Sequence, residues 1–208
     1  FLARLRRSPA TAFSRERRDF LAGVGLGLPL AWLAARFPGR RRAASAPPIL
    51  PPGAHDAAAF GAVCHRCFAC VAVCPTGVLR VGARLERPLS GWFQPELNPE
   101  HGACEEFCNR CSAVCPTGAI ARLDLEAKRR RQIGVAEVRR DACLAWRDGA
   151  WCMVCGEYCP YGAIAASDSA AGVPRPVVDP SRCRGCGICQ HNCPARRAGR
   201  AIVVRGLA

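Results

Sequence analysis

The chain contains the stretch Cys183-Arg-Gly-Cys186-Gly-Ile-Cys189-Gln-His-Asn-Cys193-Pro194, in which the cysteines follow the spacing C-x2-C-x2-C-x3-C-P. The same spacing occurs earlier, at Cys64-His-Arg-Cys67-Phe-Ala-Cys70-Val-Ala-Val-Cys74-Pro75. Two further runs also end in Cys-Pro but have a longer first gap: Cys104, Cys108, Cys111 and Cys115, and Cys143, Cys152, Cys155 and Cys159. All 16 cysteines of the 208 residues belong to these runs, so one local unit is repeated four times.

This spacing is typical of the cysteine runs that bind 4Fe–4S clusters. Three thiolates two residues apart on a tight loop can bind three corners of one cubane, and the fourth reaches the other cluster of a pair. Zinc sites usually present separated cysteine pairs, and disulfides would not require such regular spacing. The sequence therefore predicts four 4Fe–4S clusters, held by all sixteen cysteines.

The residues around each run predict the fold. Each Cys-Pro is followed by a short apolar segment, such as Val78-Leu79 or Ala163-Ile164, and Val135–Val138 and Val177–Asp179 precede the third and fourth runs as expected strands. Each unit is therefore interpreted as strand, loop, one-turn helix and strand. Two units make one ferredoxin-like module, so we expect an α+β, loop-rich fold of two modules within residues 61–208.

The spacing leaves open which runs pair. Sequential pairing joins the first run to the second, and nested pairing joins the first run to the fourth and the second to the third. The longer gaps fall on the two middle runs, which favours nesting. In that case Cys193 would complete the first-run site and Cys74 the fourth-run site, while Cys115 and Cys159 would be exchanged within the inner pair.

The net charge of +14 would ordinarily suggest nucleic acid or an anionic membrane as a partner. However, residues 1–46 hold ten Arg against two acidic residues, so +8 of the charge lies there and +6 remains. An oxidised 4Fe–4S centre with its four thiolates carries about −2, so four centres bring the folded body to about −2. Nucleic acid is therefore not an expected partner.

The N-terminal segment, residues 1–46, is interpreted as a targeting signal. Arg17, Arg18, Phe20 and Leu21 form the core of a twin-arginine motif and precede an uncharged stretch up to Ala35. A transmembrane helix is the alternative, but sixteen residues extend only about 24 Å. We expect the folded protein to be exported to the periplasm by the twin-arginine machinery, with membrane retention if the segment is not cleaved. Residues 47–60 are expected to be a linker.

Other residues carry weaker signals. His55, His65, His101 and His191 could replace cysteine ligands, but the four quartets are complete and leave no vacancy. Trp146 and Trp151, in the long gap of the third run, are expected to shield a cluster. The basic run 128–131 is either a solvated turn or a docking patch. No nucleophile–base pair or phosphate-binding loop is recognisable, so an electron carrier is expected rather than an enzyme.

The order of the four gaps after a twin-arginine-like signal resembles the MauM/NapG family of ferredoxin-type proteins over nearly the whole chain. The resemblance implies a periplasmic component of a quinol dehydrogenase, which receives electrons from a membrane-bound NapH-like iron–sulfur partner. It also implies a downstream periplasmic acceptor, in a nitrate reductase or methylamine-oxidation system. Two alternatives remain: a subunit attached directly to a molybdenum oxidoreductase or hydrogenase, and a maturation or structural protein whose clusters do not cycle.

Overall fold

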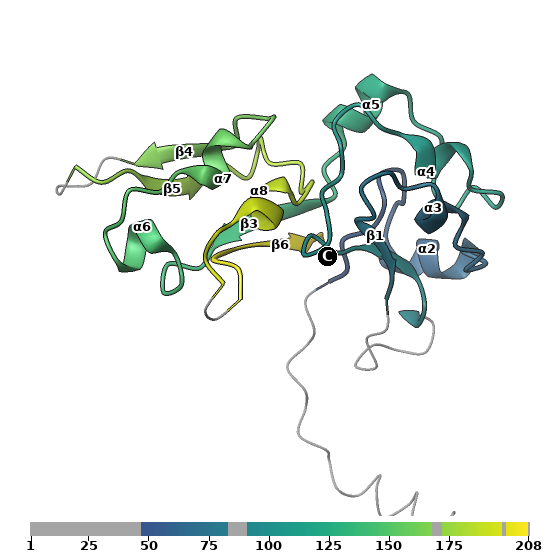
Figure 1. Ribbon diagram of the computed structural model, residues 1–208. Helices are drawn as coiled ribbons and strands as arrows, with labels where there is room; N and C mark the ends of the chain where they lie inside the picture. Colours follow the sequence, from purple (N-terminus) through teal and green to yellow (C-terminus); the bar gives the residue numbers. More distant parts are fainter. Residues whose placement is uncertain (1–46, 83–90, 168–171, 197–198, 208) are drawn as a thin grey trace, which may run out of the picture. The chain divides into compact units, whose positions relative to one another are not determined.

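The computed structural model describes residues 47–82, 91–167, 172–196 and 199–207, all within one unit that spans Ser45–Ala208 (Figure 1). The first two cysteine runs lie among five short elements: α2 (Ala57–Val63), α3 (Ala69–Ala72), β1 (Leu79–Val81), β2 (Pro95–Leu97) and α4 (Arg110–Ala113). A connecting helix, α5 (Leu125–Arg130), follows. The last two runs lie among β3 (Gly134–Val138), α6 (Leu144–Arg147), α7 (Val154–Glu157), β4 (Ile164–Ser167), β5 (Arg175–Val178), α8 (Ile188–Asn192) and β6 (Ile202–Gly206).

The three sheets are antiparallel pairs that hold consecutive runs together. β1, which leaves the first run, pairs with β2, which leads to the second run, and Leu79 lies opposite Leu97. β4 and β5 connect the third and fourth runs in the same way, and β3 pairs with β6 around them. The second half therefore follows the expected repeat. The strand predicted at 135–138 lies within β3, and the strand predicted at 177–179 corresponds to the end of β5, which stops at Val178.

In the first half, the counterpart of the β3–β6 pair is much reduced. No strand follows the second run at Ala119 and Ile120, although the repeat predicted one. Instead, the N–H of Ala121 donates a hydrogen bond of 3.0 Å to the carbonyl oxygen of Gly53. Ile120 is still buried, so this segment keeps its packing role without forming a ladder.

The segment 47–60 belongs to the folded unit, which corrects its expected role as a linker. Ile49 and Phe60 are buried in the core, and the carbonyl oxygen of Ile49 accepts a hydrogen bond of 2.8 Å from the N–H of Leu97. α2 begins after Asp56, whose carboxylate accepts from the N–H of Ala59 as an N-cap. The segment therefore packs against the first half of the fold and is not a free linker.

The core is small and is built around the cysteines. Its largest fully buried side chains include Phe60, Ile120 and Val78, and otherwise it consists mainly of Ala, Val, Ile and Cys. The helices α3, α4, α7 and α8 are short because Cys-Pro follows each of them, and a residue before proline is disfavoured in the helical conformation. Within the described residues, no helix has the length and apolar character needed to span a membrane. The predicted signal with Arg17, Arg18, Phe20 and Leu21 lies outside them.

Candidate iron–sulfur sites

Each cysteine run forms a tight loop that leads into a one-turn helix. In the fourth run, Gly185 and Gly187 have φ of 75° and 86°, the left-handed conformation that favours glycine. A Cβ atom at Gly185 would lie 2.4 Å from the backbone nitrogen of Gly134. The equivalent positions of the first run are Arg66 and Phe68, at φ of 53° and 60°. The first-run loop therefore adopts the same path with two strained side chains, a cost of about 1–2 kcal/mol per residue.

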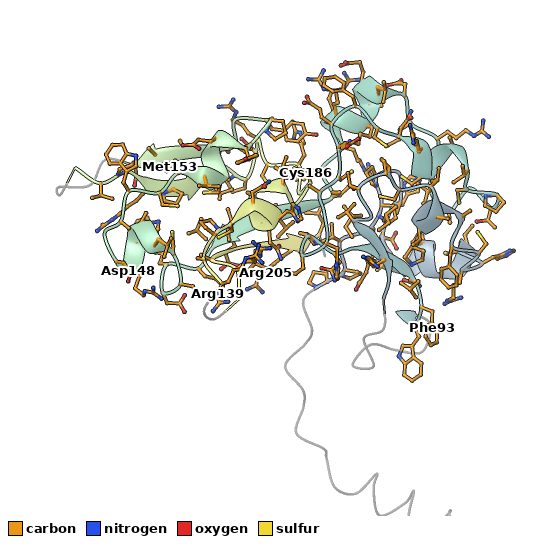
Figure 2. All side chains as sticks on the ribbon, in the orientation of Figure 1. Phe93, Arg139, Asp148, Met153, Cys186 and Arg205 are labelled. Carbon is orange, nitrogen blue, oxygen red and sulfur yellow. The ribbon has the colours of Figure 1, made fainter. Side chains whose placement is uncertain are left out.

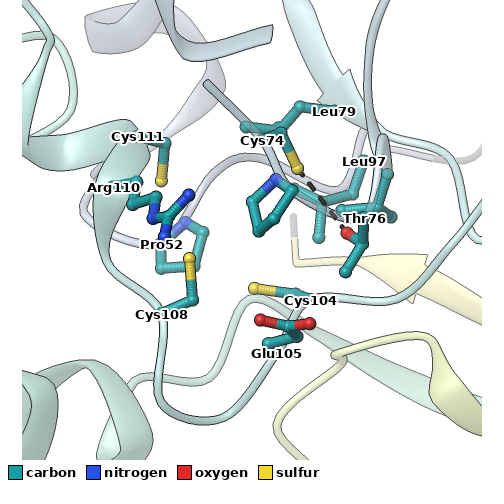
Figure 3. Close-up of a pocket in the computed structure, with 12 residues that line it drawn as sticks. Pro52, Cys74, Thr76, Leu79, Leu97, Cys104, Glu105, Cys108, Arg110 and Cys111 are labelled. Carbon is teal, nitrogen blue, oxygen red and sulfur yellow. Dashed lines mark hydrogen bonds between the residues drawn. The ribbon is translucent and has the colours of Figure 1, made fainter. Parts of the chain in front are cut away.

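The first of two similar cavities is lined by the last cysteine of the first run and the first three of the second. Figure 3 shows the side chains of Cys74, Cys104, Cys108 and Cys111 around one space. The space between its walls, including solvent that reaches into it from outside, is about 360 Å³. Its other walls include the apolar side chains of Val78, Leu79 and Leu97. We call this set of cysteines the second-run group.

The second cavity has the same composition in the other half of the protein. Its cysteines are the first three of the third run and the last of the fourth: Cys143, Cys152, Cys155 and Cys193. The space between its walls, including solvent that reaches into it from outside, is about 350 Å³, and it is bordered by Val138, Leu144 and Ile202. α6, formed within the long gap of the third run, contributes Leu144 to the wall. We call this set the third-run group.

The remaining cysteines form two further groups. Because Cys74 and Cys193 line the two cavities, Cys115 and Cys159 are left to complete the first and fourth runs. Burial raises the pKa of the Cys70 thiol to about 11, and the charges of Cys64, Cys67 and Cys115 add to this rise. Burial also raises the pKa of Cys186 to about 11, with contributions from Cys104, Cys159 and Cys183. We call these the first-run group (Cys64, Cys67, Cys70 and Cys115) and the fourth-run group (Cys183, Cys186, Cys189 and Cys159).

The cysteines therefore pair sequentially, and the nested pairing favoured by the sequence is wrong. Cys193 lies with the third run and Cys115 with the first, whereas nesting required Cys193 at the first run. The reason is the hairpins: β1–β2 and β4–β5 connect consecutive runs and bring α3 against α4 and α7 against α8. The length of a gap inside a run changes only the loop around its own site, so it contains no information about the partner run.

The surroundings of the cysteine sulfurs fit 4Fe–4S clusters. Backbone N–H groups donate to sulfur from Ile120 to Cys115 at 3.4 Å, and from Ala163 to Cys159 at 3.3 Å. Although burial opposes it, hydrogen bonds from Ile120 and Thr117 lower the pKa of the Cys115 thiol. Such donors stabilise the thiolate form that binds iron. Across the described residues, no three His, Cys, Asp or Glu side chains converge as they would on a single metal ion.

The four groups lie in one continuous series. α3, which contains Cys70, packs against α4, which contains Cys111, so the first-run and second-run groups are neighbours. The second-run and fourth-run groups meet where the N–H of Cys104 donates a 2.8 Å hydrogen bond to the carbonyl oxygen of Cys186. α7, which contains Cys155, packs against α8, which contains Cys189, so the third-run and fourth-run groups are neighbours as well. The order is therefore first-run, second-run, fourth-run, third-run.

The two tryptophans of the third-run gap have different environments. Trp146 is partly buried and donates from Nε1 to the carbonyl oxygen of Pro176 at 3.1 Å. The guanidinium groups of Arg140 and Arg175 lie 4.2 and 4.9 Å from its ring centroid. Trp146 is thus held against Pro176, a residue that also lines the third-run cavity, whereas Trp151 is 78% exposed, which does not agree with the shielding role expected of it. Figure 2 draws the side chains on the ribbon and labels two residues of this half, Cys186 of the fourth run and Met153 of the third-run loop.

Lys128 is the functional candidate that sequence reasoning missed. The basic run 128–131 was interpreted as a solvated turn or a docking patch, but Lys128 is buried on α5. Its ammonium group donates hydrogen bonds to the carbonyl oxygens of Glu105 and Glu106, between Cys104 and Cys108. The sequence contains one feature that could have indicated this site. The first gap of the second run is one residue longer than in the first and fourth runs, so its loop has one more carbonyl group that can accept a hydrogen bond.

Comparisons with known proteins agree with this arrangement. A family model described as a 4Fe-4S dicluster domain matches residues 63–119 and again residues 150–196. The first match spans the first two runs, and the second spans the fourth run and the third run from Cys152 onward, without Cys143. The chain is also 33% identical over 179 residues to the methylamine utilization ferredoxin-type protein MauM of Methylophilus methylotrophus, which covers 80% of this chain and 75% of that protein.

Proposed function

Because the chain belongs to the MauM-like family of ferredoxin-type 4Fe–4S proteins, we propose that it relays electrons through four clusters, from a membrane-bound quinol-oxidising iron–sulfur partner to a periplasmic acceptor. The acceptor belongs to a methylamine-oxidation system or a nitrate reductase-like system. The methylamine branch is supported by the name of the relative, which concerns methylamine utilization. Export by the twin-arginine route, with the signal at Arg17 and Arg18, belongs to the same proposal.

The single observation that carries the relay is the continuous order of the four cysteine groups. α3 packs against α4 and α7 against α8, which brings the groups of each half together, and the two halves meet at the hydrogen bond between Cys104 and Cys186. A 4Fe–4S cluster accepts and releases one electron at a time. The protein's part is to hold the sites in sequence, surround them with apolar side chains and leave the first-run and third-run groups at the two ends.

The relay is tested with membranes from the source organism that lack this chain. The purified holo-protein is mixed with these membranes and a reduced quinol analogue without oxygen, and bleaching of the visible iron–sulfur absorption is followed. We expect rapid bleaching that requires both the membranes and the quinol. The Cys186→Ser variant, which retains the two end groups, should bleach only in part.

Two results would contradict this function. Rapid reduction by a co-purifying molybdenum oxidoreductase or hydrogenase, without membranes, would identify the chain as a subunit of that enzyme. Clusters that no quinol or enzyme donor reduces would identify a maturation or structural protein. In either case the four sites themselves would remain.

A further inference from the structure

Lys128 carries a buried positive charge directly beside the second-run group. The side chain is only 5% exposed, and its ammonium group lies against the loop between Cys104 and Cys108. α5 holds it there: the carboxylate of Asp124 caps the helix by accepting from the N–H of Ala127 at 2.6 Å. An ammonium group in such a position has lost most of its hydration, which is costly unless another charge compensates it.

No carboxylate provides that compensation within the described residues. The acceptors of Lys128 are two neutral carbonyl groups, those of Glu105 and Glu106. The carboxylate of Glu106 is occupied by Arg129, at 2.5 Å, and that of Glu126 by Arg129 and Arg130. The loop that Lys128 binds lies between Cys104 and Cys108, so the thiolates of the second-run group are negative groups placed to compensate its charge.

We propose that Lys128 is the counter-charge of the second-run cluster and selectively raises the reduction potential of that cluster. A cluster with four thiolates carries about −2 when oxidised and about −3 when reduced, so a nearby buried cation stabilises the reduced form more. Among the described residues the other buried cation beside a cysteine group is Arg200, which donates to the carbonyl oxygen of Cys193, but its charge is paired with the carboxylate of Glu100. This inference rests on the proposed function, in which all four groups hold clusters. It means that the second-run cluster holds an electron more tightly than it would without Lys128.

Three substitutions separate the charge of Lys128 from its hydrogen bonds. Lys128→Arg keeps the charge and the donors, Lys128→Gln keeps donors without the charge, and Lys128→Met removes both. Arg130→Gln is the matched control, because it removes one positive charge from the exposed face of the same helix. Each holo-protein is purified anaerobically, and the midpoint potentials of its clusters are measured by EPR-monitored redox titration. The signal of the second-run cluster is assigned from its change in Cys108→Ser.

We expect Lys128→Gln and Lys128→Met to reduce the equilibrium constant for reduction of the second-run cluster at least tenfold, about 59 mV for a one-electron couple. The other clusters should shift by less than half as much, and Lys128→Arg and Arg130→Gln should remain near the wild type. Wild-type potentials in Lys128→Gln together with a shift in Lys128→Met would overturn the proposal, because hydrogen bonding rather than charge would then set the potential. Equal shifts of all clusters would also overturn it. The iron content and quinol reduction of the wild type report separately on the proposed function.

Discussion

The backbone N–H of Cys104 donates a hydrogen bond of 2.8 Å to the carbonyl oxygen of Cys186, which joins the second-run loop directly to the fourth-run loop. Both residues belong to cysteine groups, so the contact between the two halves is also the contact between two cluster sites. Close packing of Pro99 against Gly187 supports the same junction, since a Cβ atom at Gly187 would lie 2.8 Å from Cγ of Pro99.

The pairing of the runs gives the first prediction. Because Cys115 lies with Cys64, Cys67 and Cys70, Cys115→Ser should change the EPR spectrum of the first-run cluster. Cys193→Ser should change that of the third-run cluster instead. A change of the first-run signal in Cys193→Ser would restore the nested arrangement.

The second prediction concerns the ion pair that crosses between the halves. The carboxylate of Glu100 accepts from Nε2 of Gln190 at 2.9 Å and from Nε of the buried Arg200 at 3.1 Å. Glu100→Gln should destabilise the holo-protein by about 1 kcal/mol, a low value because the Glu100 side chain is half exposed. Thermal unfolding measures this difference, with Glu105→Gln as an exposed control.

The pH dependence of that difference is fixed by the direction of the pKa shift. Although burial opposes it, hydrogen bonds from Gln190 and Arg200 lower the pKa of Glu100. A lowered carboxylate pKa contributes stability above the unfolded value of about 4.3 and loses it only as pH falls through the folded value. The destabilisation by Glu100→Gln should therefore be constant from about pH 8 to pH 5.5. A difference that already shrinks near pH 6.5 would contradict this prediction.

The left-handed positions of the first and fourth runs should respond oppositely to substitution. Phe68→Gly relieves a strained conformation, so the holo-protein should keep its iron and lose less than about 1 kcal/mol, with a gain if strain dominates. Gly185→Ala adds both strain and a Cβ atom 2.4 Å from Gly134, and should cost more than about 2 kcal/mol and reduce iron content. Chemical denaturation and iron analysis measure both effects. Equal tolerance of the two changes would show that the loops do not share one path.

Much of this architecture could be predicted from the sequence because it is local. The spacing of Cys183, Cys186 and Cys189 determines a loop and a one-turn helix, and Val135–Val138 forms a strand as expected. Pairing could not be predicted, because it depends on hairpins that connect different runs. The burial of Ile49 was hidden by the surrounding prolines, and that of Lys128 by its neighbours Arg129 and Arg130, which resemble a solvated surface.

Spin–spin interaction in the fully reduced protein tests the continuous series most directly. EPR of the anaerobic, fully reduced holo-protein should quantify to about four spins per chain, from about sixteen iron atoms. The spectra should show interaction between the first-run and second-run, second-run and fourth-run, and fourth-run and third-run clusters. Cys186→Ser should abolish or alter the coupling of the fourth-run cluster to both of its neighbours while leaving that of the first-run and second-run clusters. Four magnetically isolated spectra, or about two spins per chain, would contradict the account.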